Sequence, residues 1–165
     1  MSTNISADDL NQILARWDRY NIPKVVKEKT TELMMKVVDK IGEMIFLGHF
    51  DINTTHSLLN TIGEKVTRPF ILCYYIGYDL ASGKISRLDG TAYLMAATDP
   101  IEGFIFKITE FIALNGATSE EKWKEMAGER SKLEKLSVDT AKLIGEVSND
   151  ICILGIENFK KIGYR

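Results

Sequence analysis

The chain has 165 residues, of which 45% are hydrophobic, 27% are charged and 9% are aromatic, and its formal net charge is −2. This length suits a single domain, and the hydrophobic share is typical of a chain that buries a core, which excludes intrinsic disorder. Two cysteines, three prolines and twelve glycines exclude a disulfide scaffold and a collagen-like chain. We therefore expect residues 1–165 to form one domain.

The distribution of charge and hydropathy excludes two classes of partner. No segment is strongly basic, so the chain lacks the row of cations that binds nucleic acid. The most apolar run, residues 69–78, is much shorter than the roughly 20 residues of a membrane-spanning helix. The polar, acidic N-terminus does not resemble a secretory signal. We expect a cytoplasmic protein.

The first half of the chain reads as helices. Ser6 and the acids after it indicate a helix start, and apolar residues recur on one helical face over residues 7–20. Pro23 suits the first turn of a long amphipathic helix over residues 23–50. A shorter helix follows Asp51, and Pro69 introduces a helix over residues 69–81 that is apolar on nearly every side. Ser82 and Gly83 supply its C-terminal stop.

The second half reads as helices too. After a connection over residues 84–90, a short helix is expected at 91–98. Asp99 and Pro100 then form a strong start signal for a helix that ends at Asn115 and Gly116. Residues 119–158 keep a helical period, which fits one long helix or two helices broken near Ser137. Residues 159–165 are expected to fray.

These elements predict an all-α fold. No alternating strand pattern is present, and the helices account for most of the chain. We predict a compact bundle of six or seven helices, with the two most apolar segments, about 69–81 and 99–115, at its centre and residues 7–20, 23–50 and 119–158 packed around them.

Two groups of residues are candidates for site chemistry. His49, Asp51 and His56 are the types that ligate metals, but they straddle a helix end, so locally hydrogen-bonded side chains are the favoured interpretation and no metal or other cofactor is predicted. A pocket between the central helices is the second hypothesis, with polar groups from one apolar helix and from a later amphipathic one. These are Tyr75, Tyr78, Asp79 and Arg130.

Catalytic motifs are lacking. The isolated Cys73 and Cys152 are interpreted as buried hydrophobic residues, and neither a nucleophile motif nor a phosphate-binding glycine loop occurs. This pattern favours a non-enzymatic protein, although residues distant in sequence can still meet in a catalytic pocket.

Apolar residues outside the predicted core faces point to a partner instead. Phe106 and Leu114 lie off the inward arc of the 99–115 helix, and Met35 and Phe46 lie off that of the 23–50 helix. Surplus apolar faces on a helical bundle bind partners or extend the core. The leading hypothesis is a helical interaction protein that binds another protein or a second copy of itself: an inhibitor, adaptor, immunity factor or assembly subunit. The alternative is a bundle with a small-molecule pocket, with or without catalysis.

Overall fold

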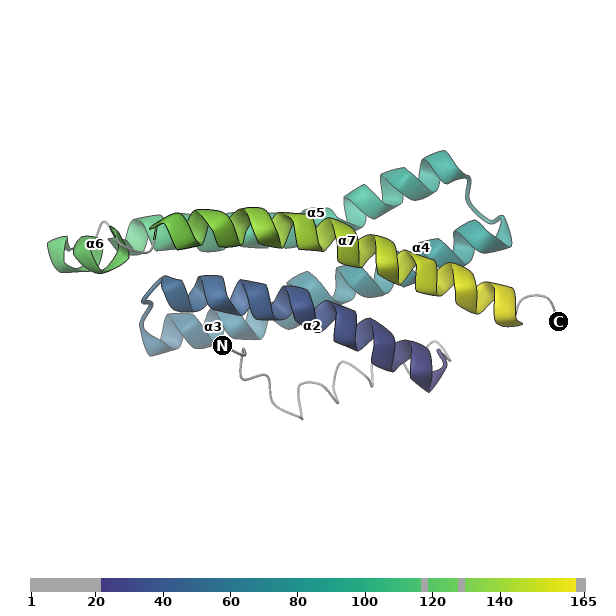
Figure 1. The fold of residues 1–165 in the computed structure, drawn as a ribbon, viewed down its shortest axis with the longest axis horizontal. Helices are drawn as coiled ribbons and strands as arrows, with labels where there is room; N and C mark the ends of the chain where they lie inside the picture. Colours follow the sequence, from purple (N-terminus) through teal and green to yellow (C-terminus); the bar gives the residue numbers. More distant parts are fainter. Residues whose placement is uncertain (1–21, 117–118, 128–129, 163–165) are drawn as a thin grey trace.

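The computed structural model describes residues 22–116, 119–127 and 130–162, and all elements in this part of the chain are helical. The predicted all-α fold is therefore confirmed, while the helix expected at residues 7–20 lies outside the described residues. The helices form an elongated bundle in which α7 runs along α2 and α4 (Figure 1). None of the described helices has an apolar stretch that would cross a lipid bilayer.

Helix α2 (Lys24–Leu47) confirms the predicted amphipathic pattern. Pro23 is its N-cap residue, and its inward face is buried along most of its length. After α2 the chain turns at Gly48 and at His49, whose φ is +49°. Asp51 then caps α3 (Ile52–Ile62), because its carboxylate accepts a hydrogen bond from the Thr54 N–H at 2.7 Å.

The sequence pattern predicts that Pro69 begins a new helix, but the structure has no break there. Helix α3 continues through a π-helical turn, η2 (Gly63–Thr67), directly into α4 (Arg68–Ser82). A proline lacks the N–H that the preceding turn would otherwise use, and a π-turn accommodates such a mismatch without ending the helix. Helix α4 ends where predicted, at Gly83, which adopts a left-handed φ of 78°.

Pro100 likewise lies inside a helix. The expected short helix at 91–98 and the expected helix start at Asp99 are wrong. Helix α5 (Arg87–Gly116) is continuous, and it includes most of the connection predicted over residues 84–90. Pro100 is exposed, whereas its neighbour Ile101 is fully buried. Burial of the apolar residues on both sides of Pro100 offsets the roughly 3 kcal/mol that an interior proline costs. The helix changes direction along its length (Figure 1).

The last region forms two helices, but the break is not near Ser137. Helix α6 (Glu120–Ala127) is short, and α7 (Arg130–Ile162) runs for 33 residues with Ser137 inside it. The expected fraying from residue 159 is also wrong as far as Ile162, because residues 159–162 are helical and Phe159 packs against Tyr78. Residues 163–165 are outside the described part.

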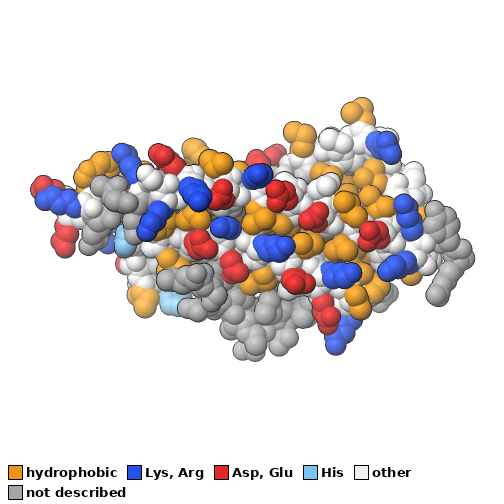
Figure 2. Space-filling model, viewed as in Figure 1, with side chains coloured by type: hydrophobic (Ala, Val, Ile, Leu, Met, Phe, Trp, Pro, Cys, Tyr) orange, Lys and Arg blue, Asp and Glu red, His pale blue; other side chains and the backbone are white. Residues whose placement is uncertain are grey.

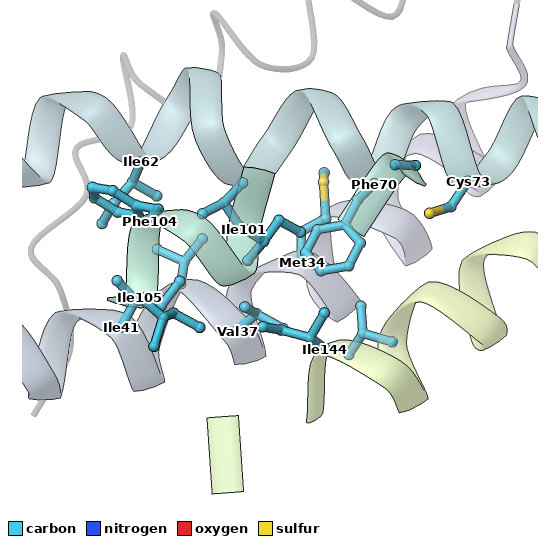
Figure 3. Packing of buried hydrophobic residues seen from close by; sticks show 14 of the residues in the cluster. Met34, Val37, Ile41, Ile62, Phe70, Cys73, Ile101, Phe104, Ile105 and Ile144 are labelled. Carbon is cyan, nitrogen blue, oxygen red and sulfur yellow. The ribbon is translucent and has the colours of Figure 1, made fainter. Parts of the chain in front are cut away.

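The core lies where α2, α4, α5 and α7 meet. Figure 3 shows side chains from these helices and from α3 pointing toward one another, among them Met34, Phe70, Ile101 and Ile144. The prediction that residues 69–81 are central holds, since α4 packs against both α5 and α7. Helix α5 contributes only one side to the core. Its buried hydrophobic residues are Ala97, Ile101, Phe104, Ile105, Ile108 and Ile112.

Candidate functional site

The residues His49, Asp51 and His56 do not converge on a metal site. Both histidines and Asp51 are exposed, and no group of three or more His, Cys, Asp or Glu side chains in the described ranges is placed to hold a metal ion. Asp51 acts as a helix cap instead. Its pKa is lowered mainly by the Thr54 N–H that it binds, with a smaller contribution from the nearby Lys122 ammonium.

Backbone carbonyls at this end of α2 are bound by side chains from α5 and α6. The amide of Asn115 donates to the Gly48 carbonyl at 2.6 Å and to the His49 carbonyl at 3.2 Å. The Lys122 ammonium donates to the same His49 carbonyl at 2.8 Å. These bonds satisfy carbonyls that a helix end leaves without intrahelical partners. Asn115 and Lys122 thus cap the end of α2, and Asp51 caps the start of α3.

The four predicted pocket residues do not share one site. Tyr78 meets the Phe159 ring edge-to-face at 5.1 Å, near the C-terminal end of α7. Arg130, by contrast, is the first residue of α7 and lies over the Trp123 ring at 5.0 Å. At the usual rise of an α-helix, Arg130 and Phe159 are about 44 Å apart along α7. Arg130 therefore lies far from Tyr78.

The tyrosine-rich part of α4 is instead the place where α4 and α7 cross. Gly77 faces the backbone of Cys152, and Gly155 faces the backbone of Tyr74 so closely that neither position has room for a side chain. Beside this crossing the buried Asn158 amide donates to the Tyr74 hydroxyl, and the Tyr74 and Tyr75 rings meet edge-to-face at 5.4 Å. The polar groups expected to line a pocket thus include partners in helix packing.

The glycines that build this crossing have only a weak signal in the sequence. Gly77 and Gly155 are recognisable as glycines within helical patterns, which often mark close backbone approach. Their pairing was not predictable, because it depends on the register between two helices more than 70 positions apart. Cys73 and Cys152 flank the same crossing, and both are buried and free, as the sequence suggested. Burial raises the pKa of Cys73 to about 12 and also raises that of Cys152.

Helix α5 presents an apolar side to solvent. The exposed fractions are 81% for Leu88, 67% for Met95, 71% for Phe106 and 61% for Leu114. On a regular helix the first three lie within about 20° of one line, with Leu114 on its border. We call these four residues the α5 outward face. Hydrophobic side chains protrude over α5 at the upper right of Figure 2.

The predicted partner residues divide between two environments. Phe106 and Leu114 belong to the α5 outward face, whereas Met35 and Phe46 on α2 are half-buried. Met35 packs against the core. Leu88 and Met95 are not among the predicted partner residues, because Pro100 favours a helix start. Their signal was nevertheless present, since they precede Phe106 by 18 and 11 residues, which is about five and three helical turns.

The surroundings of the α5 outward face are acidic. Asp99, Glu102 and Glu110 are exposed on the same side of α5, and none of them pairs with a lysine or arginine of the described segments. The spaces between the large apolar residues hold small exposed ones: Ala92, Ala96, Gly103 and Ala113.

The sequence matches no known family model, no curated protein and no solved structure at a significant level. Functional inference therefore rests on the chemistry of the chain's own residues.

Proposed function

We propose that this chain is a non-enzymatic helical interaction protein that binds its partner through the α5 outward face. The observation that carries the proposal is the exposure of Leu88, Met95 and Phe106 along one side of a single helix. Large apolar side chains aligned on one exposed side of a helix favour an interaction site, whereas single scattered exposed hydrophobic residues have no such meaning.

Other exposed hydrophobic residues in the described part of the chain lack this arrangement. They are Val25 on α2, Ile52 on α3, Leu72 on α4, Trp123 on α6 and Val138, Ile153 and Ile162 on α7, and Tyr93 lies on another side of α5. Helix α5 differs because four large apolar side chains follow one another over 27 residues. A helix that needed only to complete the core would carry polar residues at these positions.

The alternative, a pocket for a small molecule, has less support. Tyr74, Tyr78 and Asn158 have packing or hydrogen-bonding partners at the α4–α7 crossing, and Arg130 is remote from them. We expect the protein to act in the cytoplasm, where buried free thiols such as Cys73 stay reduced. Its partner is another protein or a second copy of the chain, and its role that of an inhibitor, adaptor, immunity factor or assembly subunit.

The test is native mass spectrometry of the protein purified from its own host, compared with the variant Phe106→Asp/Leu114→Asp. We expect the wild-type chain to carry a bound protein or a second copy, and the variant to be a monomer near 18.6 kDa. Circular dichroism checks that the variant folds, which we expect because both side chains are exposed. If the folded variant keeps every contact of the wild type, the assignment of this surface is wrong.

A further inference from the structure

We propose that the α5 outward face binds a cationic amphipathic helix, that is, a helix whose apolar stripe is bordered by lysine and arginine. This inference rests on the proposed function and adds the chemistry of the partner. Helix-in-groove recognition matches an apolar stripe on one helix to an apolar surface on the other, and the flanking charges select the partner.

Between Leu88 and Phe106 the charges beside the face have one sign, and the cations Arg87 and Lys107 lie at the two ends of this stretch. From Leu88 to Phe106 the acids are Asp89, Asp99 and Glu102, and no lysine or arginine occurs in this stretch. The next cation, Lys107, lies 5.5 Å from the centre of the Phe111 ring. Phe111 is half-buried, and on a regular helix it lies well away from the line of Phe106. The Lys107 ammonium, which lies over Phe111, is therefore directed away from the centre of the face. A partner that covers the face therefore meets the Asp99 carboxylate near the line of the face and the Glu102 carboxylate beside it.

These carboxylates disfavour a second copy as the occupant. If two α5 helices paired antiparallel through Leu88–Leu114, the two-fold axis would pass near residue 101. Asp99 of each copy would then lie near Glu102 of the other across the interface. Like charges held opposite one another across an interface oppose association. A partner with lysine or arginine at these positions converts the same repulsion into attraction.

The alternation of large and small side chains along the face also suits the binding of a helix. Small residues separate the large ones, and a Cβ built on Gly103 would meet no atom within 4 Å. Side chains of a partner helix can therefore enter between Met95 and Phe106. The span from Leu88 to Phe106 is about 27 Å along a regular helix, which a partner of about 18 residues covers.

The experiment measures fluorescence anisotropy of a labelled 18-residue helical peptide that carries leucine on one face and lysine on its borders. A second peptide has glutamate in place of each lysine. We expect the lysine peptide to bind the wild-type protein at least tenfold more tightly than the glutamate peptide. Phe106→Ser should weaken lysine-peptide binding about tenfold. The double variant Asp99→Asn/Glu102→Gln should weaken it about threefold to tenfold and make it less sensitive to salt.

A matched variant controls for general attraction between a cationic peptide and an acidic protein. Glu146→Gln/Asp150→Asn removes the same charge from exposed positions of α7, and we expect it to leave the affinity within twofold of wild type. Met95→Ser, also on the exposed face, is a second probe of apolar contact and should weaken lysine-peptide binding.

The outcomes separate this inference from the proposed function. If Phe106→Ser weakens both peptides equally and the Asp99/Glu102 variant has no effect, the face binds helices but the charge of the partner is wrong. If the α7 charge variant weakens binding as much as the α5 variant, the attraction is unspecific and the inference fails. If Phe106→Ser and Met95→Ser leave peptide binding unchanged, both proposals fail. Self-association that depends on Phe106, measured by sedimentation, would make a second copy the occupant and overturn this inference alone.

Discussion

Substituting Gly77 by alanine tests the crossing of α4 and α7. A Cβ at this position would lie 1.9 Å from the Cys152 carbonyl oxygen, and a Cβ at Gly155 would lie 2.1 Å from the Tyr74 carbonyl oxygen. Both obstacles are backbone atoms, so no side-chain rotation removes them. An ordinary contact begins at 3.4 Å, which means that the two helices must move apart by about 1.5 Å at Gly77.

Three contributions set the size of the effect. Separating packed helices costs about 1–3 kcal/mol or more, as overpacking of a core does. The same movement weakens the buried hydrogen bond from Asn158 to the Tyr74 hydroxyl, which is worth about 1 kcal/mol. Alanine gains about 1 kcal/mol over glycine in helix propensity. The last two contributions nearly cancel, so we expect Gly77→Ala to lower the free energy of unfolding by about 1–3 kcal/mol.

Urea unfolding followed by circular dichroism measures this change. Gly145→Ala is the matched control, because Gly145 lies in α7 and an added Cβ there meets no atom within 4 Å. It should stabilise the protein by about 0.5–1 kcal/mol. In the double variant Gly77→Ala/Gly155→Ala the loss should be smaller than the sum of the single losses, because one substitution already opens the crossing.

Unfolding of Gly77→Ala at the same urea concentration as Gly145→Ala would contradict the close packing of α4 on α7. Strict additivity of the two glycine substitutions at the crossing would contradict it too, since that result would mean that they act at unconnected places.

Further predictions concern buried groups. The raised pKa of Cys73 means that its thiol loses a proton at lower pH in the unfolded chain than in the folded one. The free energy of unfolding should therefore fall between about pH 9 and pH 12, by up to about 1.4 kcal/mol per pH unit. Urea unfolding at several pH values should show that the free energy of unfolding of Cys73→Ala falls less steeply with pH. Tyr74→Phe leaves the buried Asn158 amide without this acceptor and should cost about 1–3 kcal/mol, part of which Asn158→Leu in the same chain should restore. Asn115→Ala removes two bonds to the end of α2 and should lower the thermal midpoint, whereas an unchanged midpoint would show that the cap carries no stability.

The sequence predicted the helical fold well, because the spacing of apolar residues within one segment is enough to indicate a helix and its buried side. The period of Met34, Val37, Val38 and Ile41 defined the buried side of α2, and α5 buries the arc that its spacing indicated. Proline positions misled the assignment of boundaries. Pro69 and Pro100 are good helix starters in isolation, but the apolar residues on both sides of each are held by the core, and this tertiary burial keeps the helices continuous.

The candidate site was predictable only in part. Phe106 and Leu114 were identifiable because a residue off the inward arc of a helix faces outward whatever the neighbours are. Leu88 and Met95 required the knowledge that α5 crosses Pro100. For the proposed pocket, the grouping of Arg130 with Tyr78 is wrong, whereas a site at Tyr75, Tyr78 and Asp79 stays a prediction. Tyr78 and Arg130 lie on different helices, and only the register of α4 against α7 decides that they are far apart.

The central claim is that a partner covers the α5 outward face, and site-specific photocrosslinking in the host cell tests it most directly. A photoreactive phenylalanine analogue replaces Phe106 in one strain and the equally exposed Val138 on α7 in another. We predict a discrete crosslinked product from position 106 that is absent from position 138. No product at either position, or the same products at both, would contradict the claim.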